Sequence, residues 1–232
     1  MDFNKKPSLE KEEEKETNLL DSLGFILENG AQEEASKDKR IGLFGEIDEE
    51  KTSEIIYSLN HYKNTGRIED PEEDPEEKPA NNNKKTKKKD KPIRYTPIEF
   101  FISTYGGSAL EMFAIYDVMR SVREECEIHT KGMGKVMSAG VLLLAAGSKG
   151  DRHIGANCRI MLHSVVGGQH GPVYNLENEF EEIKWIQEQY ITALAQETNM
   201  TKRYIKNLLA RKVNVYLTAK EAVELGIADK II

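Results

Sequence analysis

A regular alternation of short apolar runs with amphipathic segments, beginning at Ile98, most constrains what this chain can fold into. Apolar runs typical of buried strands cover residues 98–103, 126–130 and 159–163. A helical pattern follows Gly107, and an apolar helix is expected over 138–146, after a glycine-rich turn. Strands that alternate with helices predict an α/β fold with a largely parallel sheet.

Elements of the same kinds flank this central pattern. A short buried strand is expected at 41–45, followed by a helix that Asp48 can cap. A long helix over Val173–Glu197 carries an apolar stripe on one face. That stripe consists of Leu176, Phe180, Ile183, Ile186, Tyr190 and Leu194. Thr218 and Glu221 have the spacing of a capping box, and Gly226 stands where a helix-ending glycine belongs.

Two charged stretches lie outside the folded pattern. Residues 1–39 are predicted to be a disordered charged arm with a short amphipathic helix at about 17–29, which could dock on its own domain, on a neighbouring subunit or on a partner protein. The folded domain is expected over 40–232, with a charged low-complexity insert at about 64–93. The lysine-rich part of the insert lacks interleaved aromatic residues and has an acidic neighbour, so a solvated loop is favoured over a nucleic-acid patch.

Overall charge and cysteine content argue against several classes of function. The net charge of -7 is unfavourable for binding nucleic acid or an anionic membrane. Cys126 and Cys158 are too few for a disulfide framework or a cysteine-based metal site. No apolar run reaches the ~18 residues of a membrane span, and residues 1–16 lack the pattern of a secretory signal. We therefore expect a cytoplasmic protein with buried thiols, and with no metal or cofactor of its own.

The glycine-rich segment 132–140 places Ser138 at the start of an apolar helix. A hydroxyl at this position lies among free backbone N–H groups at the positive end of the helix dipole. That environment suits the negative oxygen that develops during acyl transfer. The segment is not the Gly-x-Ser-x-Gly elbow of α/β-hydrolases, because Val136 occupies the first glycine position. A serine that merely caps the helix would fit the segment equally well.

His163 ends a buried strand just before a turn that contains Gly167 and Gly168. A histidine at the end of a rigid strand is well placed to enter a cleft. A histidine with a purely structural role is the alternative interpretation.

Several motifs in register resemble the ClpP family, the proteolytic subunit of the Clp protease. They lie at 101–108 (Phe-Ile-Ser-Thr-Tyr-Gly-Gly-Ser), at 134–140, at 143–147, at 159–163 with the following glycine pair, and at 217–231. The match runs from about Arg40 to the C-terminus and is interrupted by the charged insert. The resemblance implies the ClpP/crotonase fold, which consists of stacked βαβ units with a long handle helix.

The resemblance also implies a serine peptidase site. Ser138 corresponds to the family nucleophile and His163 to its general base, while Gly107 and Ala139 correspond to the backbone N–H donors of the oxyanion hole. His163 would accept the Ser138 proton, the hydroxyl would attack a peptide carbonyl, and water would hydrolyse the acyl-enzyme. The implied protein is a serine endopeptidase in a heptameric or double-heptameric ring, supplied with polypeptides by a Clp-type ATPase.

The third member of the catalytic triad departs from the family. No Asp or Glu occurs between Glu197 and Glu221, and Asn214 best matches the family aspartate, although a small gap would place Lys212 there. An amide oxygen can hold the tautomer of His163 but cannot stabilise the imidazolium by charge. We therefore expect an active but slower peptidase.

Other departures concern the oxyanion loop and the oligomer. Tyr105 stands where the family usually has proline, which predicts a less rigid loop. Residues 1–39 do not resemble the family segment at the axial pore, which weakens the expectation of an ATPase partner. Val173–Glu197 corresponds to the handle through which two rings meet. Trp185 and Ile191 lie off its main stripe, which predicts a second buried face, although both could be tolerated surface residues.

Two other functions compete with the peptidase. A weakly active or non-catalytic ring subunit, paired with an active paralogue, is supported only by the missing aspartate. A crotonase-type acyl enzyme would share the oxyanion donors, but that class does not use the pair of Ser138 and His163.

Overall fold

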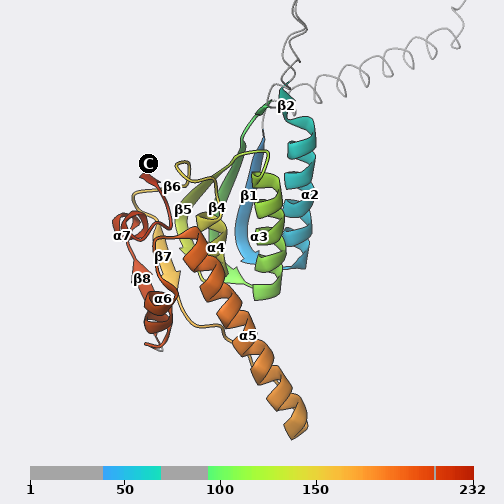
Figure 1. Cartoon of the computed structure of the whole chain (residues 1–232), viewed down its shortest axis with the longest axis vertical. Helices are drawn as coiled ribbons and strands as arrows, with labels where there is room; N and C mark the ends of the chain where they lie inside the picture. Colours follow the sequence, from blue (N-terminus) through green and yellow to red (C-terminus); the bar gives the residue numbers. More distant parts are fainter. Residues whose placement is uncertain (1–38, 69–93, 212) are drawn as a thin grey trace, which may run out of the picture. The chain divides into compact units, whose positions relative to one another are not determined.

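The sheet predicted from the alternating pattern is present, and its strands are mostly parallel (Figure 1). In the computed structural model, which describes residues 39–68, 94–211 and 213–232, the main sheet has the order β1-β4-β5-β6-β9, with β7 paired to β5 and β8 to β7. The strands are β1 (Arg40–Ile47), β4 (Ile98–Gly107), β5 (Ile128–Met137), β6 (His153–Ile154), β7 (Arg159–Leu162), β8 (Val215–Leu217) and β9 (Lys230–Ile231). Within the described sheet, only β7 and β8 pair antiparallel. The predicted α/β fold is confirmed.

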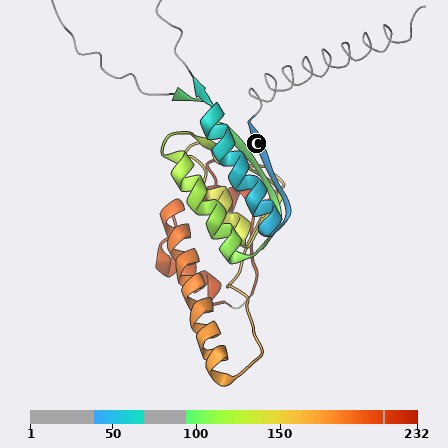
Figure 2. The same cartoon turned by 90° about the vertical axis from the view of Figure 1, so that its right-hand side faces the viewer.

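Helices flank the sheet. They are α2 (Glu49–Thr65), α3 (Ala109–Arg123), α4 (Ala139–Ala145), α5 (Val173–Glu197), α6 (Lys202–Leu209) and α7 (Ala219–Glu224). Figures 1 and 2 show α2 and α3 side by side; α2 packs against β1 and β4, and α3 against α4 and β5. Alternate residues of β4, Ile98, Phe100 and Ile102, are fully buried beneath these helices. The burial follows the period of two expected of a strand that is covered on one side.

Side-chain caps define the helix ends as the sequence predicts. Asp48 accepts a hydrogen bond of 2.9 Å from the N–H of Lys51 at the start of α2. Thr218 and Glu221 form the predicted capping box of α7. Gly226 follows this helix with φ +72°, a left-handed conformation that glycine adopts without strain.

The glycine-rich segment before Ser138 differs from the predicted turn. It is part of β5, which continues to Met137 because 135–137 pair with 159–161 of β7. Gly132 lies in the strand where α4 approaches closely, and a Cβ there would be 3.0 Å from a methyl group of Leu144. The glycine therefore permits close packing between strand and helix, and pairing on both sides outweighs its low strand propensity.

The described residues at the edges of the predicted insert form regular structure. Helix α2 extends to Thr65, and β2 (Arg67–Ile68) pairs antiparallel with β3 (Arg94–Tyr95). The rest of the predicted insert, the predicted arm and its helix at 17–29 lie outside the described residues. Arg40–Ile232 form one unit. No described helix is long and apolar enough to cross a membrane.

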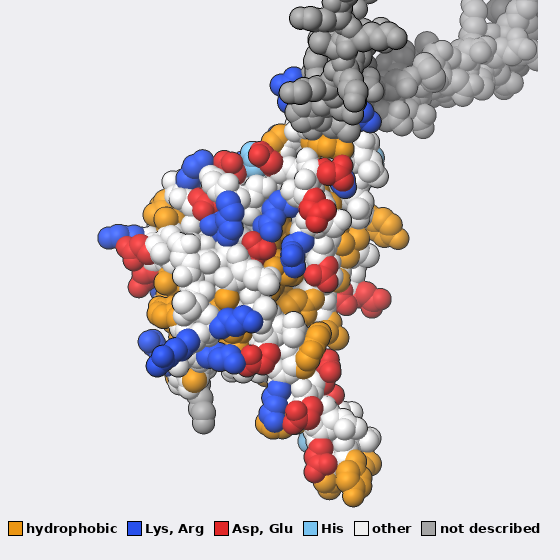
Figure 3. Space-filling model, in the orientation of Figure 1, with side chains coloured by type: hydrophobic (Ala, Val, Ile, Leu, Met, Phe, Trp, Pro, Cys, Tyr) orange, Lys and Arg blue, Asp and Glu red, His pale blue; other side chains and the backbone are white. Residues whose placement is uncertain are grey.

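The two halves of α5 have different environments. Its second half buries Tyr190, Ile191 and Leu194, whereas Phe180 and Trp185 in its first half are exposed. Figures 1 and 2 show this first half projecting from the other elements, and Figure 3 shows apolar atoms at its far end. Ile191 thus belongs to the core of this unit, while Trp185 lies on its surface.

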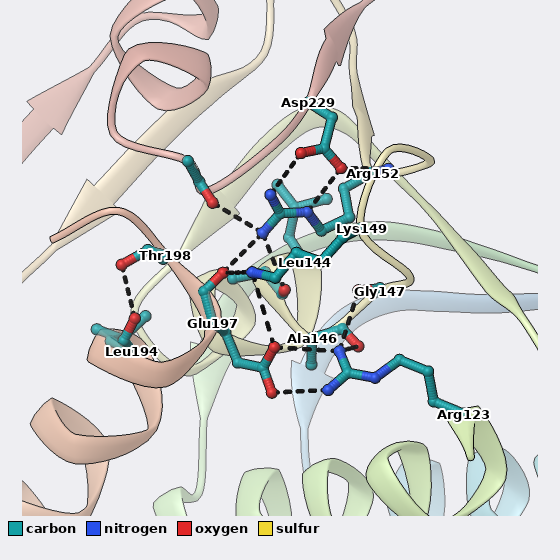
Figure 4. Close-up of polar contacts among 12 residues, drawn as sticks. Arg123, Leu144, Ala146, Gly147, Lys149, Arg152, Leu194, Glu197, Thr198 and Asp229 are labelled. Carbon is teal, nitrogen blue, oxygen red and sulfur yellow. Dashed lines mark hydrogen bonds and ion pairs between the residues drawn. The ribbon is translucent and has the colours of Figure 1, made fainter.

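A buried network of charges attaches the end of α5 to the sheet (Figure 4). Arg152 pairs with Asp229 through two hydrogen bonds of 2.5 and 2.8 Å. It also donates to the carbonyl oxygens of Ala145, Glu197 and Gly226. The Glu197 carboxylate accepts from both Arg123 amino groups, at 2.9 and 3.1 Å. The pairs Arg152–Asp229 and Arg123–Glu197 link residues that are 77 and 74 positions apart in the sequence.

Candidate active site

Ser138 occupies a strained position between β5 and α4. Its φ of +53° and ψ of −124° make it the one non-glycine residue with positive φ among the described residues. Its side chain makes no capping hydrogen bond with the helix, so the interpretation as a simple helix cap is wrong. The N–H of Ser138 donates to the carbonyl of Met161 at 2.8 Å, which anchors this turn to β7. Strained residues of this kind gather at functional sites.

His163 reaches Ser138 because β7 runs parallel to β5. Met161 lies opposite Met137, and His163 follows two residues later, just past the end of the strand. Its Nε2 lies 2.8 Å from the Oγ of Ser138. With the ring proton on Nδ1, the hydroxyl donates to Nε2, which is the arrangement in which a histidine can accept the serine proton.

A cavity of about 180 Å³ opens at this pair. Its lining combines polar groups with apolar side chains. The lining residues are Gly107, Ser108, Ala109, Met112, Ser138, Ala139, His163, Ser164, Val165, Val166 and Tyr190. Gly107 and Ala139, the two residues predicted to supply the oxyanion-hole donors, are among these lining residues.

The loop Gly106–Gly107 lies directly against the serine. A Cβ at Gly106 would be 2.6 Å from the Cβ of Ser138, and a Cβ at Gly107 would be 2.3 Å from the carbonyl oxygen of Ile47. The two residues have φ of +108° and +151°. Only glycine satisfies both the space and the conformation. Ala139 is the first residue of α4, where the backbone N–H has no partner inside the helix.

Helix α5 holds the serine from the opposite side. The Tyr190 hydroxyl donates to the carbonyl oxygen of Ser138 at 3.0 Å, and burial raises the pKa of this phenol. The side-chain amide of Gln187 accepts from the N–H of Val165 at 3.3 Å, which tethers the segment after His163. From the sequence, Tyr190 was expected only as one member of the apolar stripe of α5. Its hydroxyl on an otherwise apolar face was the signal for a polar contact.

Asn214 and His163 directly follow the last residue pair between β7 and β8, and no hydrogen bond joins them among the described residues. Leu162 pairs with Val215 in the antiparallel ladder of β7 and β8, so one further step of the register sets His163 opposite Asn214. Asn214 is exposed, and no hydrogen bond among the described residues joins it to the histidine. The side chain of Lys212, the alternative candidate, lies outside the described residues. The register therefore favours Asn214 as the neighbour of His163.

The remaining reactive groups lie away from this pair. Cys126 and Cys158 are buried free thiols, and burial raises the pKa of Cys158 to about 11. Among the described residues, Glu127, His129 and Asp151 form a group whose potential ligand atoms lie within 4.8 Å of one another. This group is at the far end of β5 from Ser138, and the Lys230 ammonium already lies 3.2 Å from Asp151. We assign no metal to it.

An α/β unit with a serine and a histidine in contact at a cavity has the components of a serine hydrolase, and comparison with known proteins narrows this class. The Clp protease family matches residues 89–232. The ATP-dependent Clp protease proteolytic subunit 1 of Prochlorococcus marinus subsp. pastoris is 34% identical over 135 residues, which are 58% of this chain and 67% of that protein. The chain therefore belongs to the Clp protease family, and its mostly parallel sheet with flanking helices is consistent with the ClpP fold.

Proposed function

We propose that this chain is a serine endopeptidase, the proteolytic subunit of a Clp-type protease, with Ser138 as nucleophile and His163 as general base. The observation that carries the proposal is the contact of 2.8 Å between Nε2 of His163 and Oγ of a serine held at positive φ. The hydroxyl is not used to cap α4, so it is free to react. Membership of the Clp protease family supports the same chemistry.

The proposed reaction follows the serine-protease scheme. Nε2 of His163 accepts the proton of the Ser138 hydroxyl while Oγ forms a bond to the carbonyl carbon of the peptide. The N–H groups of Gly107 and Ala139 donate to the oxyanion. His163 then gives its proton to the leaving amine as the C–N bond breaks, and water hydrolyses the resulting ester by the same proton transfers in reverse.

The proposal assigns Asn214 the place of the usual aspartate. A side-chain rotation would let its amide oxygen accept the Nδ1–H of His163, which would fix the reactive tautomer without adding a negative charge. The imidazolium formed during the reaction would then be less stabilised than in a site with a carboxylate. We therefore propose an active but slow peptidase.

Assembly, partner and location are further parts of the proposal. The exposed apolar side chains on the first half of α5, Val173, Tyr174, Phe180 and Trp185, fit a surface at which two heptameric rings meet. Such a ring would enclose the sites, and a Clp-type ATPase would deliver unfolded polypeptides to them. We propose a cytoplasmic location, because both described cysteines are buried free thiols.

The decisive experiment compares wild type with Ser138→Ala and with the matched control Ser164→Ala, whose serine lines the same cavity. We expect Ser138→Ala to lower kcat for a fluorogenic peptide by at least about a thousandfold and to abolish labelling by a fluorophosphonate. Ser164→Ala should stay within about threefold of wild type. The native mass of each sample shows whether rings have formed. Equal activity of wild type and Ser138→Ala would exclude the proposed site.

A non-catalytic ring subunit is the second candidate, because no described residue offers a carboxylate hydrogen bond to His163. For this candidate, the wild type would assemble into rings yet react with neither the peptide nor the fluorophosphonate. The experiment above therefore separates the two functions.

A further inference from the structure

We propose that Thr104 is a positioning residue that holds the Gly106–Gly107 loop against Ser138. This inference rests on the proposed function, because the loop matters for activity only if it receives an oxyanion. The observation behind it is a buried hydroxyl that bridges an irregularity in the sheet beside the site.

The irregularity is a β-bulge in β4. Gly45 of β1 pairs with Thr104, but the next residue of β1, Glu46, pairs with Gly106, so Tyr105 is an extra residue without a partner in β1. The register with β5 also shifts here, between Ile102 and Thr104. A bulge bends a strand and leaves backbone groups without their ladder partners. Those groups need other partners when they are buried.

The Thr104 side chain supplies these partners. Its hydroxyl donates to the carbonyl oxygen of Gly45 at 2.5 Å and accepts from the N–H of Gly106 at 2.9 Å. The carbonyl oxygen of Gly106 lies 3.3 Å from the same hydroxyl. Thr104 is fully buried, so water cannot replace these bonds. Both ends of the bulge are therefore held by one hydroxyl group.

The methyl group of Thr104 contacts the other half of the site. A Cβ at Gly140 would lie 2.4 Å from this methyl, so the first turn of α4 packs directly on Thr104. Gly106, held by the hydroxyl, in turn lies against Ser138. One side chain thus sets the distance between the oxyanion loop and the helix that begins just after the nucleophile.

Tyr105 does not take over this role. Its side chain is 68% exposed, and its ring is contacted by the Lys135 ammonium, 4.4 Å from the ring centroid, on the surface of the sheet. A proline would restrict this turn through its fixed φ. Here the hydrogen bonds of Thr104, the residue before Tyr105, restrict the same turn.

Two substitutions separate the hydroxyl from the methyl of Thr104. Thr104→Val keeps the shape and removes the hydroxyl, and Thr104→Ser keeps the hydroxyl and removes the methyl. If Thr104→Val does not fold, Thr104→Ser and Thr104→Ala form a second pair that differs only in the hydroxyl. The measurements are kcat and KM for a peptide, the affinity for a peptide boronate that forms a tetrahedral adduct with the serine, and amide hydrogen exchange at 105–107.

We expect Thr104→Val to lower kcat about a hundredfold, because a small displacement of the oxyanion donors is costly. Boronate affinity should fall by a similar factor, while KM changes by less than about threefold. Hydrogen exchange at 105–107 should accelerate. Thr104→Ser should stay within about fivefold of wild type in every measurement, and Thr104→Ala should resemble Thr104→Val.

Two results would overturn the proposal: unchanged kcat and boronate affinity in folded Thr104→Val, or equal losses in Thr104→Ser and Thr104→Val. Loss of thermal stability alone indicates a role in folding only, and that also contradicts it. Failure of the proposed function would give a different result, because the wild type itself would then neither hydrolyse the peptide nor bind the boronate. In that case unchanged exchange at 105–107 in Thr104→Val would still overturn the assignment of Thr104 as the residue that holds the loop.

Discussion

The network around Arg152 and the pair of Ser138 and His163 are the two main polar clusters of the unit, and they are built in opposite ways. In the network, charges meet opposite charges at short range, as in the pairs Arg152–Asp229 and Arg123–Glu197. At the site, the bonds are between neutral groups, and Tyr190 and Thr104 hold the backbone on either side of the serine. Among the described residues, the network pairs its arginines with carboxylates, whereas no carboxylate forms a hydrogen bond with His163.

This difference predicts which property a substitution in each cluster should change, stability or catalysis. A buried ion pair that loses one partner leaves an uncompensated charge, so the network should govern stability. A neutral pair at the edge of a cavity contributes little to folding and can be tuned for chemistry. The predictions below test this division, beginning with the largest effect.

Arg152→Met should cause the largest loss of folding stability among these variants. The substitution leaves Asp229 without its guanidinium partner and removes a donor from three carbonyl oxygens, of which, among the described residues, only that of Glu197 keeps another side-chain donor, Lys149. We expect a loss of about 3–5 kcal/mol in the free energy of unfolding, measured by urea denaturation.

The matched control is Lys230→Met, which removes an exposed ion pair with Asp151 and should change stability by less than about 1 kcal/mol. Similar losses of unfolding free energy in Arg152→Met and Lys230→Met would contradict the idea that buried charges govern stability and exposed charges do not. The Ser138→Ala variant should be as stable as wild type within about 1 kcal/mol, since it removes one hydroxyl at a cavity.

Asn214→Asp should make the site more like the network, because it adds a carboxylate near His163. A carboxylate opposite His163 would stabilise the imidazolium and the reactive tautomer, so we expect kcat for a peptide to rise by at least on the order of tenfold. Asn214→Ala is the control and should lower kcat if the amide supports the histidine. Unchanged or lower kcat in Asn214→Asp would count against Asn214 as the third member.

The smallest effect concerns the pH dependence of stability. Burial alone would raise the pKa of Asp229, but hydrogen bonds from Arg152 and Gly150 outweigh it and lower the pKa to about 2, from an ordinary value of 3.8. Because the folded state binds the proton less tightly than the unfolded state, Asp229 contributes stability above about pH 4 that is lost as the pH falls toward about 2.

Urea unfolding of wild type and Asp229→Asn over this pH range measures that contribution. The difference in unfolding free energy between the two proteins should be constant above about pH 5 and should shrink below about pH 4. A difference that does not depend on pH would show that the carboxylate charge is not what Arg152 requires.

Much of the fold followed from local patterns. The apolar run at 98–103, the helical pattern after Gly107 and the caps at Asp48 and Thr218 depend on near neighbours in the chain, so they could be predicted. The glycines at 132–140 could not, because glycine serves both turns and close packing: Gly132 lies against Leu144 within β5, Gly140 lies against Thr104, and Gly134 has φ +64°. The prediction of a turn there was wrong for that reason.

The sequence by itself determined the chemistry that is available: a serine after a glycine-rich segment, a histidine at a strand end, two glycines before a helix, and an asparagine in place of an acid. Only the tertiary structure decided the distances. The contact of Ser138 with His163 depends on the parallel register of β5 and β7, and the roles of Thr104 and Tyr190 depend on a bulge and on a helix 52 residues beyond the serine. Such contacts join residues remote in the chain, and no local preference encodes them.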